Sequence, residues 1–144
     1  MSSGSTDDGG SWRARRRDAA GEHAEALVRR QAAQTAAARG LIEDFVREAT
    51  ARNLPSRPLT ARSYDGRARY RTPLRGWYLR LNESVAVGTD GEFYILTVPA
   101  SLRSRWRGAT PVPGDPPLIL GKGGRDGESI DLADALDRAL NPQP

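Results

Sequence analysis

The sequence predicts an α+β fold, in which an antiparallel β-meander of three to five strands packs with a long N-terminal helix and a short C-terminal helix. Three stretches carry this prediction. Residues 18–52 are rich in alanine and contain no proline, which favours a helix. Residues 77–98 are rich in aromatic and β-branched residues and include an Asp-Gly turn signal. Residues 132–140 place leucine and alanine on one helical face.

The N-terminal third is expected to be a helix after a short tail. Residues 1–11 are small and polar, so we expect them to be disordered, and we expect one α+β domain over residues 12–144. Within the helical segment 18–52, small or apolar residues and two glutamines recur at alternating steps of four and three. This stripe comprises Ala20, Ala24, Leu27, Gln31, Gln34, Ala38, Leu41 and Phe45. Gly40 leaves two alternatives, one long helix or a helix pair broken at that glycine.

The basic segment 53–76 carries several prolines and glycines and is expected to be loop with short extended pieces at 60–64 and 67–72. Over residues 67–72 arginine alternates with small or aromatic residues. A strand there would present three arginines on one face and Ala68, Tyr70 and Thr72 on the other.

The meander over residues 77–98 is expected to have strands at 77–81, 85–88 and 92–98. A two-residue turn at Asp90–Gly91 would pair Val87 with Tyr94. A similar turn at residues 82–83 would place Trp77, Leu79 and Leu81 on one face. Both faces of this meander are apolar, so either other elements cover both faces or one face binds a partner.

The C-terminal segment 99–141 is expected to hold helical turns at 100–107, a proline-rich connector at 110–117 and a short strand at 118–120. A glycine-rich loop then leads to a helix at 132–140, with Asp131 as its N-terminal cap.

Composition excludes several classes of site. The chain has no cysteine and one histidine, His23, so neither a disulfide framework nor a multi-histidine zinc site can form, and we expect no cofactor and no metal. No apolar run reaches the length that crosses a bilayer, and no signal peptide is evident, so we expect a cytoplasmic protein that does not bind membranes.

Charge is distributed unevenly along the chain. There are 22 basic and 18 acidic residues, and 21 of the basic residues are arginine. Such a ratio, together with abundant alanine, glycine and proline, is typical of GC-rich bacterial coding and is weak evidence for function. The positions are better evidence, because eight arginines and one acid lie between Arg52 and Arg80, and five acids lie between Asp126 and Asp137.

No residue pattern singles out a catalytic group. His23 is expected to be a surface residue, and acidic pairs such as Glu43–Asp44 and Asp131–Asp134 are expected to lie on solvated helix faces or at caps. The glycine-rich loop 121–129 departs from the phosphate-binding pattern, and its own acids oppose an anion. It remains a candidate anion or nucleotide site through Lys122, Gly123, Gly124 and Arg125.

The arginine- and aromatic-rich segment 52–80 is the other candidate binding site. Arginines suit phosphates and tyrosines suit base stacking, which is typical of nucleic-acid binding. The residues expected to take part are Arg62, Arg67, Arg69, Tyr70, Arg71, Arg75 and Arg80. Alternatively, these arginines pair with the acidic C-terminal residues of the same chain. Our leading hypothesis is a non-catalytic binding or regulatory module that contacts a protein partner or forms a homodimer through the N-terminal helix.

Overall fold

The computed structural model describes residues 5–98, 111–121 and 128–142. The chain divides into two compact units, Met1–Gln34 and Thr35–Pro144. Helix α1 (Ser5–Ala51) is continuous through Gly40, so of the two alternatives the single long helix is confirmed. It begins at Ser5, within the stretch 1–11 that the composition predicts to be disordered; adding residues to an existing helix costs little free energy.

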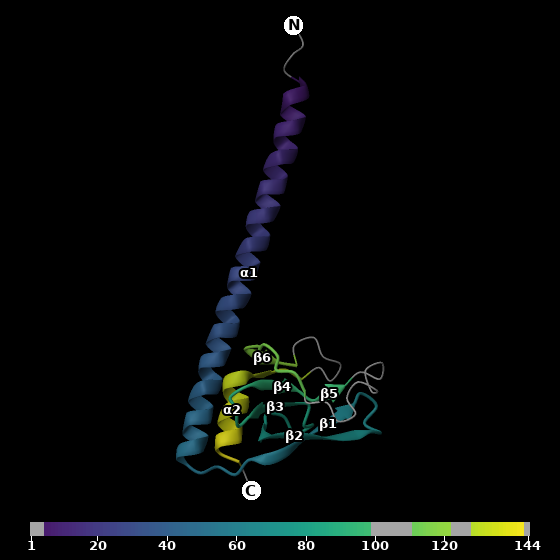
Figure 1. Ribbon diagram of the computed structural model, residues 1–144. Helices are drawn as coiled ribbons and strands as arrows, with labels where there is room; N and C mark the ends of the chain where they lie inside the picture. Colours follow the sequence, from purple (N-terminus) through teal and green to yellow (C-terminus); the bar gives the residue numbers. More distant parts are fainter. Residues whose placement is uncertain (1–4, 99–110, 122–127, 143–144) are drawn as a thin grey trace. The chain divides into compact units, whose positions relative to one another are not determined.

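The second unit has an α+β fold, as predicted (Figure 1). Its sheet has five strands in the order β4-β3-β2-β1-β5. The strands are β1 (Arg57–Ser63), β2 (Arg69–Tyr78), β3 (Val85–Gly88), β4 (Phe93–Ile95) and β5 (Thr97–Val98). A separate pair joins β6 (Ile119–Leu120) to β7 (Ile130–Asp131), which leads directly into α2 (Leu132–Leu140).

Strands β1 and β2 form a longer antiparallel pair than the sequence predicts over residues 53–76. The register pairs Arg62 with Arg69 and Thr60 with Arg71, then jumps so that Pro58 pairs with Arg75. Pro73 lies inside this irregular stretch, where its missing N–H removes no regular ladder bond. The pairing of β1 with β2 therefore accommodates a proline that, in the sequence, argues for a loop.

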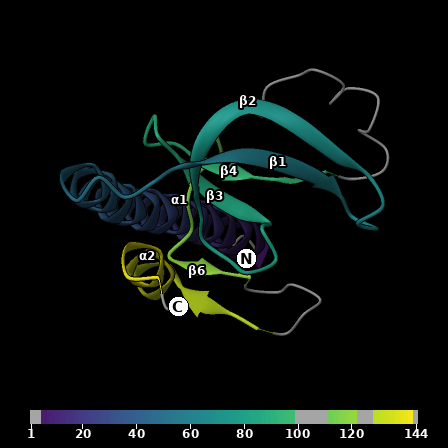
Figure 2. The ribbon, with the colours of Figure 1, turned by 90° about the horizontal axis from the view of Figure 1, so that it is seen from below.

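The sheet closes on itself at Leu96. Strands β4 and β5 are consecutive pieces of one stretch of chain, yet β4 pairs antiparallel with β3 at one edge and β5 pairs parallel with β1 at the other. The Leu96 N–H donates to the Ser84 carbonyl and the Leu96 carbonyl accepts from the Arg62 N–H, both at 2.8 Å. The sheet is thus mixed rather than purely antiparallel, and Figure 2 shows β1 and β2 arching over β3 and β4.

Both faces of the sheet around β3 and β4 carry buried side chains within the second unit. Leu59, Ala86, Tyr94 and Leu96 fill the concave face. The other face, with Trp77, Val87 and Phe93, packs against the part of α1 after Thr35 and against α2. Phe45 of α1 meets Trp77 edge-to-face at 5.4 Å between ring centroids. The two apolar faces of the meander are therefore explained by intramolecular packing.

In the β3–β4 hairpin, the observed register differs from the predicted register by one residue. Val87 pairs with Phe93, and Ala86, rather than Val87, pairs with Tyr94. The loop has three residues instead of two, because Gly91 takes a positive φ of 83° and the Gly88 N–H donates to the Glu92 carbonyl. A one-residue shift exchanges the faces of a strand, so the predicted assignment of side chains to faces is wrong on one strand.

The β2–β3 connection is also longer than predicted. The Leu79 N–H donates to the Val85 carbonyl, so residues 80–84 form the loop in place of a two-residue turn at 82–83. The Asn82 carboxamide oxygen accepts from the Ser84 N–H and hydroxyl, and Glu83 takes a positive φ. Trp77 and Leu79 are buried, as expected, whereas Leu81 is fully exposed.

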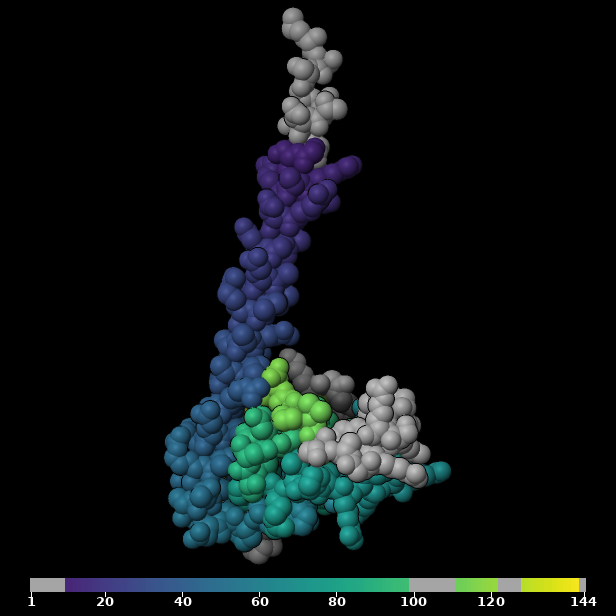
Figure 3. Space-filling view, in the orientation of Figure 1, coloured from purple at the N-terminus to yellow at the C-terminus, as the bar shows by residue number. Residues whose placement is uncertain are grey.

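The C-terminal segment has the predicted short strand and helix, and also a strand, β7, that the sequence did not predict. Helix α2 occupies the predicted residues, but Asp131 at its N-cap position makes no side-chain capping bond. The helical turns expected at 100–107 fall outside the described residues. Residues 111–121, light green in Figure 3, lie along the surface, and the Gly114 N–H donates to the Phe93 carbonyl. Within the described ranges neither helix is apolar and long enough to cross a membrane.

Candidate functional site

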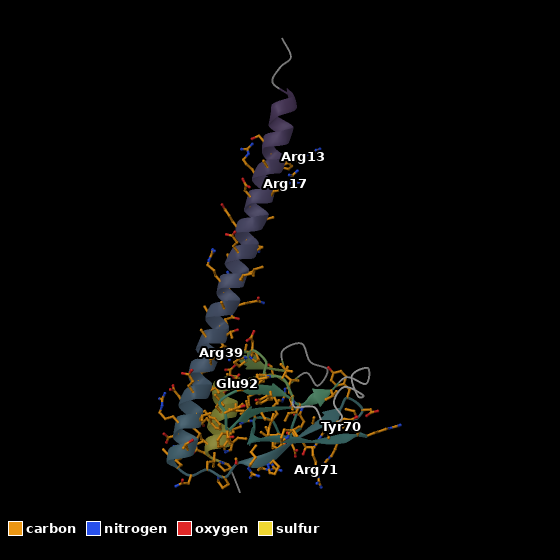
Figure 4. All side chains as sticks on the ribbon, in the orientation of Figure 1. Arg13, Arg17, Arg39, Tyr70, Arg71 and Glu92 are labelled. Carbon is orange, nitrogen blue, oxygen red and sulfur yellow. The ribbon has the colours of Figure 1, made fainter. Side chains whose placement is uncertain are left out.

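The predicted basic site lies on β1, β2 and the β2–β3 loop. Along β2, Arg69, Arg71 and Arg75 are exposed and alternate with half-buried residues, as the period-two pattern predicts. Arg62 lies directly across from Arg69 on β1. Tyr70, by contrast, is half-buried and lies across from the buried Ala61, so it belongs to the opposite face of the β1–β2 pair (Figure 4).

Several of the predicted arginines are occupied inside the chain. Arg62 is about 29% exposed and forms an ion pair with Glu83 at 3.5 Å. Arg75 donates to the hydroxyl and carbonyl of Ser56 at 3.3 and 2.8 Å. Arg80 donates to the Glu128 carbonyl at 3.2 Å. These three side chains tie the sheet to neighbouring segments, so their first role is structural.

Arg67, Arg69 and Arg71 differ from them. All three are exposed, and among the described residues their side chains make no hydrogen bond or ion pair. Tyr64 lies in the turn between β1 and β2 and is 69% exposed. We define the arginine face as Tyr64, Arg67, Arg69 and Arg71.

The basic segment does not form ion pairs with the acidic C-terminal residues in the described ranges. Arg52 pairs with Glu48 at 2.7 Å and Arg62 with Glu83. Two other contacts reach the C-terminal segment, from Arg80 to the Glu128 carbonyl and from Arg52 to the Asn141 carboxamide at 3.1 Å. Within these ranges, intramolecular charge pairing therefore leaves the arginine face unneutralised.

In the first unit, residues 10–34 are helical and exposed almost throughout. From residue 10 to residue 34 only Ala26 is half-buried. Three large apolar side chains are exposed on it: Trp12 at 53%, Leu27 at 43% and Val28 at 64%. Arg16 stacks over the Trp12 ring at 3.9 Å, and Arg29 pairs with Glu25. We call residues 10–34 the exposed segment.

Sequence reasoning missed a cluster of charged groups in the second unit. Arg39 of α1 pairs with Asp115 at 2.7 Å and lies 3.8 Å from Glu92 (Figure 4). These residues come from three separate parts of the chain, so no local sequence pattern predicts the contact. The side chains are 41–78% exposed, which limits the cluster to a surface link between α1, the β3–β4 hairpin and the segment 111–121.

An open groove between α1 and α2 in the second unit has a volume of about 310 Å³. Its lining is Leu41, Asp44, Phe45, Glu48, Ala133, Leu136, Asp137 and Leu140. Two of its carboxylates are already paired, Asp44 with Arg47 and Glu48 with Arg52. The groove therefore offers a mainly apolar floor without a converging set of free polar groups, which small-molecule sites normally have.

The other candidate residues supply no assembled site. Lys122, Gly123, Gly124 and Arg125 lie outside the described residues, so their role as an anion site stays a prediction. His23 is exposed on α1. In the described ranges no three His, Cys, Asp or Glu side chains are grouped so as to hold a metal ion. The buried Tyr94 has its pKa raised by burial and by its hydrogen bond to Asp90, and so stays neutral.

Comparison of the chain with protein-family models, with curated proteins and with solved structures found no match. Function is therefore argued from the chain's own residues.

Proposed function

We propose that the protein is a non-catalytic cytoplasmic association module, in which the exposed segment binds a second copy of the chain. The observation that carries the proposal is the exposure of Leu27 and Val28 on a helix that has no buried side chain between residues 10 and 34. An isolated helix in water is only marginally stable, and most helices in proteins are stabilised by packing of one face.

The spacing of the stripe supports a helix as the partner. Ala20, Ala24, Leu27, Gln31 and Gln34 follow the four–three repeat of coiled-coil core positions. Alanines at these positions allow two helices to approach closely. Glutamines at two core positions weaken the contact but favour a defined register. The later members of the same repeat, Ala38 and Phe45, are buried in the second unit.

The exposed apolar area sets the strength of this association. Complete burial of a leucine or valine side chain contributes about 1.5–3 kcal/mol, so burying what is exposed of Leu27 and Val28 contributes about 1 kcal/mol each. Two copies then gain about 4 kcal/mol from these side chains, which only offsets the lower range of the association cost of about 4–15 kcal/mol. The alanine contacts must supply the rest, and we expect a dissociation constant in the micromolar range.

Sedimentation equilibrium of the full chain tests the proposal. The double variant Leu27→Asp/Val28→Asp should be monomeric at concentrations where the wild type dimerises. The matched control is Leu81→Asp/Val112→Asp, which changes a leucine and a valine of the second unit that are even more exposed and should leave the dimer intact. A wild type that stays monomeric at high micromolar concentration, or equal weakening by both variants, would contradict the proposal.

A further inference from the structure

The arginine face carries positive charge that the described residues do not balance. Two carboxylates lie near it, Asp65 and Glu83. Glu83 pairs with Arg62, and Asp65 accepts bonds from the Ser63 hydroxyl and the Arg67 N–H inside its own turn. Arg69 and Arg71 lie beyond that turn on β2 and have no carboxylate partner in the described ranges. Exposed arginines held without partners suit an external polyanion.

The strand fixes the spacing of these charges. Arg69 and Arg71 are two residues apart on one face of β2, and so their backbones are separated by about 7 Å. Arg62, although paired with Glu83, lies directly across from Arg69 and widens the positive strip to β1.

Tyr64 adds an exposed aromatic side chain in the turn that joins β1 to β2. Tyr64 is 69% exposed, and its backbone N–H donates to the Val98 carbonyl at 3.1 Å, which fixes the turn to the edge of the sheet. Unpaired bases stack on such rings, whereas bases inside a duplex are already stacked and cannot reach one. Exposed arginines on β2, together with an exposed tyrosine in the turn that precedes it, therefore favour a single strand over a duplex.

We propose that the arginine face binds single-stranded nucleic acid, with Arg67, Arg69 and Arg71 on phosphates and Tyr64 stacked against a base. This surface is distinct from the exposed segment, and its function does not depend on dimerisation. The side chains of Arg69 and Arg71 make no hydrogen bond or ion pair in the described ranges, so they can be replaced without breaking such a bond.

Fluorescence anisotropy of a labelled oligo-uridine, titrated with the full chain at several salt concentrations, tests this proposal. The variant Arg69→Gln/Arg71→Gln should lower affinity about ten-fold or more at low salt. It should also reduce the slope of log K against log salt by about 1.4, because each phosphate contact on a single strand contributes about 0.7. Circular dichroism confirms that the variant is folded.

The control is Arg13→Gln/Arg17→Gln, which removes two charges from exposed arginines of the first unit that form no side-chain hydrogen bond or ion pair with another described residue (Figure 4). It should change affinity by no more than about two-fold, with the slope unchanged. Equal losses in the two variants would show an effect of net charge alone and would overturn the proposal. So would undetectable binding by the wild type at low salt, equal affinity for duplex, or binding to phosphatidylserine vesicles without binding to oligo-uridine.

The stacking contribution is tested separately at Tyr64. Tyr64→Ala should weaken binding about five-fold or more, whereas Tyr64→Phe, which keeps the ring, should bind like the wild type. If alanine and phenylalanine have the same effect, Tyr64 does not stack on a base.

Discussion

Gly40 offers the sharpest test of how α1 is built, because the sequence leaves the helix either continuous or broken there. The structure has Gly40 inside the helical range Ser5–Ala51, away from both ends. A Cβ added at this position meets nothing within 4 Å. Replacement by alanine therefore adds no clash and removes the conformational cost of glycine in a helix.

We expect Gly40→Ala to raise the free energy of unfolding by about 1 kcal/mol, the usual difference between alanine and glycine in a helix interior. For a chain of this size the melting temperature should rise by about 3–4 °C. Urea unfolding followed by circular dichroism at 222 nm, together with a thermal scan, measures both quantities. A fall in stability would mean that Gly40 ends a helix with a backbone that alanine cannot adopt, and the continuous α1 would be refuted.

Four further changes test the packing of the second unit. Gly76→Ala should destabilise it by about 1–3 kcal/mol or more in urea unfolding, because the new Cβ would clash with the Val87 carbonyl oxygen. Unchanged stability would refute the close approach of β2 and β3. Phe45→Ala should lower the free energy of unfolding by about 3–5 kcal/mol and alter Trp77 fluorescence. Leu27→Ala in the exposed segment should change the stability of the monomer by less than about 0.5 kcal/mol. Similar losses at both sites would contradict their different burial. Arg39→Ala should lower the free energy of unfolding by no more than about 1 kcal/mol. Its coupling energy with Asp115→Ala in a double-mutant cycle should decrease as salt is added. A larger coupling energy that does not depend on salt would contradict a surface link. Tyr94 has a raised pKa, so the folded state keeps the phenol proton to a higher pH than the unfolded chain does. This group should leave the free energy of unfolding unchanged below about pH 10 and lower it as the pH rises further. In the same alkaline titration, the free energy of unfolding of Tyr94→Phe should fall less steeply.

Local patterns in the sequence predicted the elements well. The long helix, the strands near 77–98 and the helix at 132–140 each follow from propensity and periodicity within a short window. Burial of Trp77 and Leu79, together on one face, also follows from period-two alternation.

The register errors have a physical cause. A turn signal such as Asp90–Gly91 fixes that a hairpin forms, but not whether its loop has two residues or three. Gly91 alone has the positive φ, and the Asp90 carboxylate accepts from the Glu92 N–H to hold the longer loop. One extra residue in the loop exchanges the two faces of a strand, so a strand can be predicted at the right residues and still be given the wrong cross-strand pairs.

Closure of the sheet at Leu96 depends on contacts that are distant in sequence. Leu96 bonds to Ser84 on one side and to Arg62 on the other, and nothing in the local sequence distinguishes it from the interior of an ordinary strand. The same holds for the contacts of Arg62 and Arg75, whose partners come from the β2–β3 loop and from the segment before β1. Residue type predicted a basic site, but only the fold separates its structural arginines from the exposed ones.

Amide hydrogen exchange at two protein concentrations tests the central proposal, self-association of the exposed segment, most directly. If a second copy packs along the stripe, the amides of residues 20–34 should exchange more slowly at high concentration, while those of the sheet in the second unit should not change. Exchange in residues 20–34 that is fast and independent of concentration up to the high micromolar range would contradict the account.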